Sequence, residues 1–288
     1  LFQKMNMRII DIHTHGINGY DTRTTDVNHI LKIAETHGSY GVSEIIPTIY
    51  PATIKIMREN MSIIKQAMEQ QNHNALSVMS NESEENNTSR ITHYASRIIG
   101  VHLEGPFLNP MKCGALNAMT FLEPNEGNLK QLIEGFEDII KIITIAPELN
   151  GAKDLIRAIT NMGIIASMGH SEATYKEADA GYRAGAKNIT HIFDAMRGLH
   201  HREPGLAGFG LTHPDIYIEL IADPYHLHEK VIEMIFKIKN SDRIIIVSDS
   251  VKEANPFTKG KGVTDTHGKL LGGAMTIQES AGRLINKG

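Results

Sequence analysis

Six side chains that could bind a metal ion or move a proton follow short apolar runs along this chain. They are His13 and His15 in IIDIHTHG, Glu104 in IIGVHLEGPF, His170 in IIASMGHS, His191 in NITHIF and Asp249 in IIIVSDS. Imidazole and carboxylate groups are common ligands of catalytic divalent metals. If the fold gathers these six residues, they predict a metal-dependent hydrolytic site.

Spacing and position suggest separate roles for the ligands. His13 and His15 lie two residues apart, so both point to the same side of a strand end, although an isolated pair of this kind can be incidental. Glu104, His170 and His191 would supply the three protein ligands typical of a catalytic metal, with one position left for water. Each of these three alone could also be structural, Glu104 as a loop cap and the histidines as packed side chains.

Asp249 and His102 each admit two interpretations. Asp249 could cap the segment that follows its strand, or it could act as a general base on the attacking water and later return the proton to the leaving amine. His102 alternates with Glu104 and is either a packed histidine or a residue that supports the ligands.

The elements that must position these residues alternate along the chain. Apolar runs predict eight strands, near 8–13, 42–47, 98–103, 141–145, 163–168, 188–191, 216–221 and 244–248. The intervening segments repeat apolar residues at three- and four-residue spacing, which is typical of helices packed on a sheet. Eight alternations predict an α/β fold, a (β/α)8 TIM-type barrel in which the C-terminal ends of the strands form one site.

One stretch interrupts this alternation. ALSVMS at 75–80 could form an additional strand, 80–90 is expected to be an exposed loop, and a short helix is expected near 88–97. The last segment, TIQESAGRLINKG, is expected to form the eighth helix. We therefore expect residues 1–288 to form a single barrel domain.

Composition restricts the class of partner. The formal net charge is −4, so nothing suggests binding to nucleic acid or an anionic membrane. No apolar stretch approaches the ~18 residues of a spanning helix. The start, LFQKMNMRII, lacks the apolar core of a secretory signal. The single cysteine, Cys113, cannot form an internal disulfide, which fits a predicted cytoplasmic location.

Several longer motifs together resemble those of the N-acetylglucosamine-6-phosphate deacetylases, a family of the amidohydrolase superfamily. The resemblance runs along nearly the whole chain, through GVHLEGPFLNPMKCGA, IAPEL, SMGHSEATY, THIFDAM, REPGLAG, IADPYH and GKLLGGAMTI. It implies a metal-dependent barrel that hydrolyses the acetamide of an amino-sugar phosphate and releases acetate. Family members usually add a small β domain made from both chain ends, for which we expect no sequence here.

The resemblance also implies roles for individual residues. Glu104, His170 and His191 match the metal ligands, and Asp249 matches the catalytic acid/base. His13 and His15 would permit the second ion that some members bind. The expected cofactor is one or two divalent ions, zinc first, with iron, cobalt or manganese also compatible.

Further matches concern the substrate and a second subunit. Arg202 matches a phosphate-binding position, and His226 matches a histidine that reaches the substrate of the neighbouring subunit, which implies a homodimer. Other matched substrate-contacting positions are Ala115, Leu116, Asp194, Ala195, Leu270, Leu271 and Gly272.

The chain departs from the family pattern at three positions. Asp194 replaces an asparagine and brings a negative charge close to the expected phosphate; Leu116 replaces a histidine and Pro224 a glycine. These changes leave open the alternative that the protein is an amidohydrolase with a different substrate, either another amino-sugar phosphate or an N-acyl amino acid. A non-catalytic metal-binding barrel is the more distant alternative, and Asp249 argues against it because such a protein needs no proton shuttle.

Overall fold

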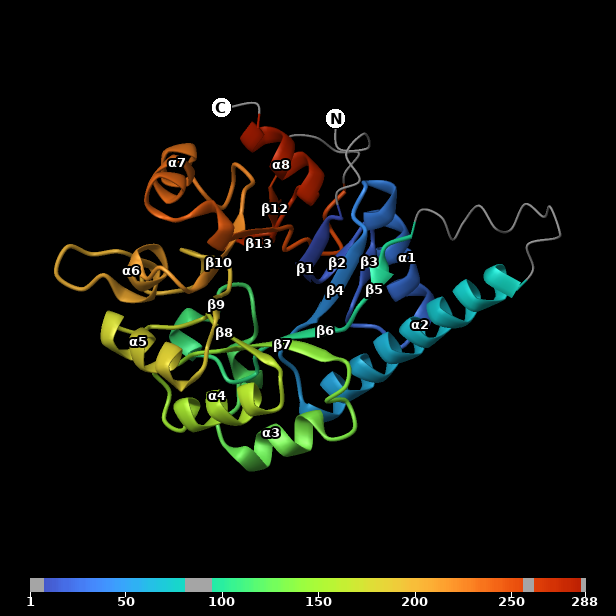
Figure 1. Ribbon diagram of the computed structural model, residues 1–288, viewed down its shortest axis with the longest axis horizontal. Helices are drawn as coiled ribbons and strands as arrows, with labels where there is room; N and C mark the ends of the chain where they lie inside the picture. The colour runs from blue at the N-terminus through green and yellow to red at the C-terminus, as the bar shows by residue number, and fades with distance from the viewer. Residues whose placement is uncertain (1–7, 81–94, 256–261, 286–288) are drawn as a thin grey trace.

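The computed structural model describes residues 8–80, 95–255 and 262–285, and these form the predicted barrel (Figure 1). Neighbouring strands pair in parallel around the path β1-β4-β6-β7-β8-β9-β10-β11, with β5 (Arg97–Ile98) beside β4. The strands of the path are β1 (Ile10–Thr14), β4 (Glu44–Ile49), β6 (Val101–Glu104), β7 (Ile140–Ile145), β8 (Ile165–Met168), β9 (Asn188–Ile189), β10 (Tyr217–Ile221) and β11 (Ile244–Val247).

Backbone hydrogen bonds join the first and last strands just beyond β11. The Asp249 amide donates to the His13 carbonyl at 2.9 Å, and the His15 amide donates to the Ser250 carbonyl at 2.7 Å. The barrel therefore closes at the two segments that carry these predicted site residues.

Helices surround the strands, as Figure 1 shows. They are α1 (Val27–Ser39), α2 (Ile54–Ser80), α3 (Glu126–Ile133), α4 (Ala152–Asn161), α5 (Tyr175–Ala184), α6 (Gly205–Thr212), α7 (Glu229–Ile238) and α8 (Ile277–Ile285). Two small antiparallel pairs lie outside the barrel path: β2 (Gly16–Ile17) with β3 (Tyr20–Asp21), and β12 (Val263–Thr264) with β13 (Leu270–Gly272). No helix in the described residues is both long and apolar enough to cross a membrane.

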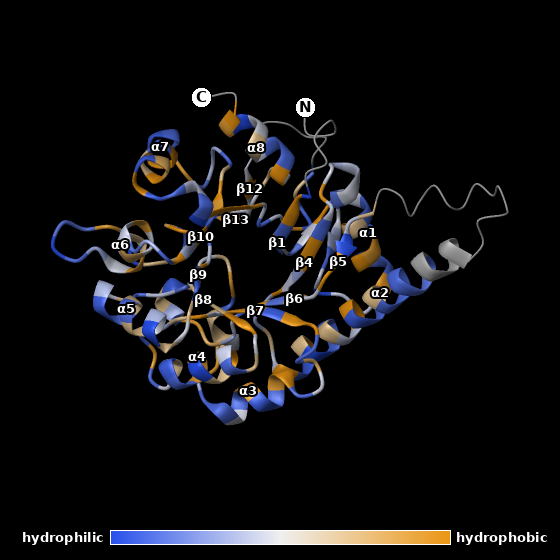
Figure 2. Ribbon diagram, viewed as in Figure 1, coloured by the Kyte–Doolittle hydropathy of each residue, from blue (hydrophilic) through white to orange (hydrophobic). Residues whose placement is uncertain are grey.

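The helices form because their sequences are amphipathic and capped. In α4 the buried residues Leu155, Ile156 and Ile159 recur at helical spacing, and in Figure 2 the surface helices alternate between blue and orange. A reciprocal capping box fixes the start of α5: the Thr174 side chain accepts from the Glu177 amide, and the Glu177 carboxylate accepts from the Thr174 amide.

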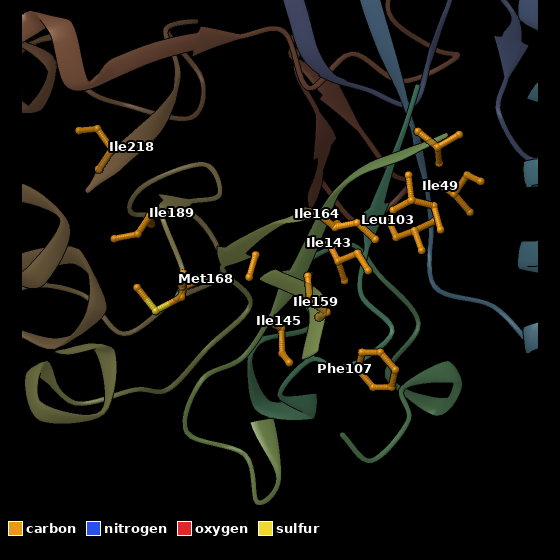
Figure 3. Packing of buried hydrophobic residues seen from close by; sticks show 14 of the residues in the cluster. Ile49, Leu103, Phe107, Ile143, Ile145, Ile159, Ile164, Met168, Ile189 and Ile218 are labelled. Atoms are coloured by element: carbon orange, nitrogen blue, oxygen red, sulfur yellow. The ribbon is translucent and has the colours of Figure 1, made fainter. Parts of the chain in front are cut away.

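The main apolar core lies between the strands and the helices. Leu103 on β6 pairs in register with Ile143 on β7, and both are fully buried. Figure 3 shows these side chains gathered with Ile49 and Ile164 in the same layer. Burying one such aliphatic side chain contributes about 1.5–3 kcal/mol relative to leaving it exposed.

The inside of the barrel is polar instead. Alternate residues on the strands point inward, and a hydrogen-bonded chain connects them. His102 Nε2 lies 2.8 Å from Thr144 Oγ1, which lies 2.9 Å from Thr190 Oγ1, which lies 2.6 Å from Ser167 Oγ. The chain continues through Asn188, which donates to Ser167 at 3.0 Å and to Glu219 at 2.6 Å. We call these six residues the polar ring.

Three details differ from the sequence-based predictions. Residues 75–80 are not a strand but the last part of α2, because the helical pattern of Ile54 onward continues through them. The short helix expected near 88–97 cannot extend to Arg97, which pairs as β5 with β4; residues 88–94 lie outside the described residues. The helix α6 departs from the amphipathic pattern expected of the segments between strands, because it is apolar on all sides.

Candidate metal centre and cavity

The six predicted residues meet at the C-terminal ends of the strands. They form two groups of possible ligands, Glu104 with His170 and His191, and His13 with His15 and Asp249. Within each group the ligand atoms lie within 4.8 Å of one another, and all six residues are buried. The barrel thus brings together residues that are up to 236 positions apart in sequence, since parallel strands share one end.

Glu104 stands between the two groups. Its Oε1 lies 3.0 Å from Nε2 of both His170 and His191, and its Oε2 lies 3.1 Å from Nε2 of His15. Asp249 Oδ1 completes the second group at 3.4 Å from His13 Nε2 and 3.6 Å from His15 Nε2. One carboxylate could therefore serve two neighbouring ions.

Hydrogen bonds to the far nitrogen fix the orientation of three of the four histidines, whereas Nδ1 of His191 is buried without a partner. His13 Nδ1 lies 3.0 Å from Glu219 Oε2, His15 Nδ1 lies 3.1 Å from the Thr48 carbonyl, and His170 Nδ1 lies 2.8 Å from the Lys112 carbonyl. Partners of this kind hold a metal-binding histidine in the tautomer that leaves Nε2 free to coordinate. The donor set of imidazole nitrogens and carboxylate oxygens thus fits a divalent ion in both groups.

Backbone strain is concentrated at the same residues. His170, His191 and Asp249 have φ angles of 47°, 27° and 46°, in the left-handed region that non-glycine residues rarely adopt. Such conformations cost about 1–3 kcal/mol each and persist where the surroundings impose them, often at functional sites. Here the left-handed turn at the end of each strand directs the side chain over the mouth of the barrel.

The charges in the cluster depend strongly on one another. Burial alone would raise the pKa of Glu104, but His170 and His13 beside it hold that pKa well below its usual range. Burial would lower the pKa of His191, but its hydrogen bond to Glu104 raises it to about 10. For His13 burial prevails and lowers the pKa to about 4. The cluster without metal therefore favours an anionic Glu104 surrounded by donors.

A cavity of about 220 Å³ opens over this cluster. Its walls include all but one of the residues predicted to contact substrate: Ala115, Leu116, Asp194, Ala195, His226, Leu270, Leu271 and Gly272. Arg202 is the exception, because it is exposed in the turn bridged by His200 and Glu203 and does not line the cavity. Gly114, Tyr50, Tyr225 and Lys269 line it and were not predicted.

Tyr50 is a missed residue that contacts the cluster directly. Its ring stacks on His15 at a centroid distance of 3.8 Å, while the Arg23 guanidinium lies 4.1 Å from the centre of the Tyr50 ring. Arg23 is in turn bound to Asp21 at 2.9 Å. The sequence does contain a signal that could have identified Tyr50. It is an aromatic residue directly after the apolar run of the second strand, and in a barrel this position faces the site.

His226 lies in the cavity of its own chain. Its Nδ1 is 3.0 Å from the carboxylate of Asp223, which lowers the pKa of Asp223 despite burial and raises that of His226. Asp194 lines the same cavity, and its Oδ2 is buried without a hydrogen-bond partner. Burial raises the pKa of Asp194 to about 6.

Comparison with known proteins agrees with this geometry. The chain is 31% identical over 271 residues to the N-acetylglucosamine-6-phosphate deacetylase of Bacillus subtilis, covering 94% of this chain and 62% of that protein. The solved deacetylase structure from Thermotoga maritima shares 26% identity, with a TM-score of 0.77 over 96% of this chain and 72% of that one. The chain is thus similar along nearly its whole length to N-acetylglucosamine-6-phosphate deacetylases.

The other comparisons concern the sugar, the length of the relatives and the family models. The family also has a relative called N-acetylgalactosamine-6-phosphate deacetylase, from Escherichia coli O157:H7, 29% identical over 85% of this chain and 59% of its own length. The chain thus spans 62% and 59% of the length of these two curated relatives. No family model matches the chain.

Proposed function

We propose that the protein is a metal-dependent deacetylase that hydrolyses the N-acetyl group of an amino-sugar phosphate, N-acetylglucosamine 6-phosphate, to the free amine and acetate. The observation that carries the proposal is the arrangement of Glu104 and Asp249 among four histidines at the floor of a cavity. The names of the relatives support the substrate class, which includes both glucosamine and galactosamine derivatives.

Glu104, His170 and His191 would hold the catalytic ion. A divalent ion bound there supplies Lewis-acid chemistry, since it lowers the pKa of a water molecule and polarises the acetyl carbonyl. We favour zinc, which catalytic sites commonly hold with histidine and carboxylate ligands, although iron, cobalt and manganese suit the same set. His13, His15 and Asp249 form a second group of suitable ligands, so we propose that up to two ions are bound.

Asp249 is the proposed proton carrier. It lines the cavity and faces the cluster from the end of β11, with its side chain only 13% exposed. As a carboxylate it can accept a proton from the attacking water, and once protonated it can give that proton to the departing nitrogen. This second step is necessary because an unprotonated amide nitrogen is a very poor leaving group.

The assembly is also a proposal. The resemblance implies a homodimer, in which the exposed Arg202 could serve the cavity of a second copy. A cytoplasmic location is consistent with the single cysteine, Cys113.

A second candidate function is hydrolysis of a different N-acyl compound. Asp194 favours it, because a carboxylate in the cavity wall repels a phosphate at close range. Leu116, also in the wall, offers no hydrogen bond to a sugar.

Acetate release from N-acetylglucosamine 6-phosphate, with zinc supplied, tests the proposal directly. The wild type should turn over this substrate, and Asp249→Asn should lose activity by at least ~100-fold, the usual size of a general acid–base contribution. Metal content should be measured for both proteins, so that lost metal is not mistaken for lost proton transfer. Turnover of unphosphorylated N-acyl compounds only would favour the second candidate.

A further inference from the structure

The cavity wall contains more carboxylates than cations. Glu104, Asp194 and Asp249 line it, whereas Lys269 is the one lysine or arginine that does so in the described part of the chain. Glu104 and Asp249 belong to the candidate metal groups, where a bound cation would offset their charge. His226 is already hydrogen bonded to Asp223. An anionic substituent of a substrate therefore has Lys269 as its available counter-charge.

A short hairpin holds Lys269 at the cavity. The Asp265 amide donates to the Lys269 carbonyl at 2.8 Å, and the Lys269 amide donates to Asp265 Oδ1 at 2.9 Å. Gly268 makes the turn with a φ of +80°, where a larger residue would be strained. At the end of β13, the Gly273 amide donates to the Asp249 carbonyl at 2.7 Å. The segment that carries Lys269 is thus tied to the backbone of the proposed acid/base.

The Lys269 side chain is free to bind a ligand. It is exposed at the cavity rim, and within residues 8–80, 95–255 and 262–285 its ammonium group has no carboxylate partner. Some lysines elsewhere on the surface do have such partners: Lys112 lies 2.7 Å from Glu172, and Lys65 lies 3.1 Å from Asp138. An ammonium group with three donors and no internal partner suits a phosphate monoester.

We propose that Lys269 binds the anionic group of the substrate and so determines the preference for a phosphorylated over a neutral N-acetyl amino sugar. This inference rests on the proposed function and adds a specificity-determining residue to it. Lys269 and Asp194 line the same cavity, so the lysine supplies a positive charge in a wall that contains this additional carboxylate. Arg202, exposed and outside the wall, is the competing candidate.

Kinetics of charge-removing and charge-retaining variants test the proposal. Lys269→Met should raise KM for N-acetylglucosamine 6-phosphate by about tenfold with kcat nearly unchanged, because the contact is the same in the ground state and transition state. Lys269→Arg should stay close to the wild type. Activity on unphosphorylated N-acetylglucosamine should not change. Lys153→Met, on the exposed side of α4 and outside the cavity wall, is the matched control for a loss of one positive charge and should behave as the wild type.

A binding measurement separates this inference from the proposed function. Titration of the chelator-treated protein with glucosamine 6-phosphate, and with glucosamine, reports phosphate recognition without turnover and without binding of phosphate to an ion. Weaker binding of the phosphorylated compound alone in Lys269→Met supports the inference even if the wild type releases no acetate, which would refute the proposed function. Unchanged binding and KM in Lys269→Met would overturn the inference, as would equal losses for both sugars. Loss in Arg202→Met but not in Lys269→Met would assign the role to Arg202.

Discussion

Glu219 Oε2 lies 3.0 Å from Nδ1 of His13, and both side chains are completely buried. Glu219 thereby links the polar ring to the first histidine of the candidate metal centre. The contact turns His13 so that Nε2 faces Glu104 at 3.5 Å and Asp249 at 3.4 Å. A buried carboxylate in this position is typical of the partner that orients a metal-binding histidine.

Glu219→Gln should therefore weaken binding of an ion by His13, His15 and Asp249. Loss of such a partner typically reduces metal affinity by about 10–100-fold. Titration with zinc, followed by metal analysis after dialysis, should show two ions in the wild type and loss of the weaker one in the variant. Glu233→Gln, on the exposed face of α7, is the control. Equal zinc content and affinity in both variants would contradict the role of Glu219.

Glu148 should have the corresponding role for the other group. It accepts hydrogen bonds from Asn109 Nδ2 at 2.9 Å, Ser171 Oγ at 2.6 Å and the Glu172 amide at 2.6 Å. These contacts hold the loop on which the strained His170 sits. Glu148→Ala should thus lower zinc affinity, but by less than the about 10–100-fold expected for loss of a direct partner of a ligand, because Glu148 contacts the neighbours of His170 and not His170 itself.

Glu148→Gln keeps the size of the side chain and part of the hydrogen bonding, so its zinc affinity should fall between those of Glu148→Ala and the wild type. Circular dichroism of the metal-free variants should match that of the wild type. An affinity in Glu148→Ala equal to the wild-type value would show that the loop holds His170 without this carboxylate.

His37 should make the metal-free protein less stable in acid. It is fully buried, with Nε2 3.0 Å from Thr14 Oγ1, and burial lowers its pKa from 6.5 to about 4. The unfolded chain binds a proton near pH 6.5, whereas the folded protein binds one only near pH 4. The contribution of His37 to stability is therefore complete above about pH 7 and falls as the pH drops to about 4, by up to about 3 kcal/mol.

Urea unfolding of the metal-free protein at several pH values measures this loss. In His37→Leu the fall in the free energy of unfolding between pH 7 and pH 5 should be smaller than in the wild type. Buried His13 and His102, whose pKa values are lowered to about 4 and about 3, add to the slope, whereas buried Asp11, whose pKa is raised to about 7, opposes it; all three remain in the variant, so the difference between the two proteins reports His37. An identical slope in both proteins would mean that His37 does not titrate as inferred.

The barrel itself was predictable because its signals are local and repeated. All eight apolar runs form strands of the barrel path, and the six metal-type residues were found because each follows such a run. Strand ends in a parallel barrel meet on one face, so position along each run was sufficient to predict the cluster.

The remaining contacts depend on long-range geometry that the sequence does not show. The left-handed turn at His191, the stacking of Tyr50 on His15 and the position of Lys269 on its hairpin follow from packing between segments far apart in the chain. The polar ring was missed because single residues such as Thr144 and Ser167 hardly disturb an apolar run. The resemblance could align Arg202 with a phosphate site but could not place its loop relative to the cavity.

Thr190 offers the sharpest test of the polar ring. Its Oγ1 lies 2.9 Å from Thr144 Oγ1 and 2.6 Å from Ser167 Oγ, with all three residues fully buried. Thr190→Val preserves volume but leaves hydroxyl partners unsatisfied, which should cost about 1–3 kcal/mol in the free energy of unfolding. Ser167→Ala removes one of those partners, so the double variant should be less destabilised than the sum of the two changes. The control is Ile143→Val, on β7 but in the apolar core between the strands and the helices. It should lower the free energy of unfolding by about 0.5–1.5 kcal/mol, and its effect should be additive with that of Ser167→Ala. Strict additivity of Thr190→Val with Ser167→Ala would show that their hydrogen bond contributes nothing to stability.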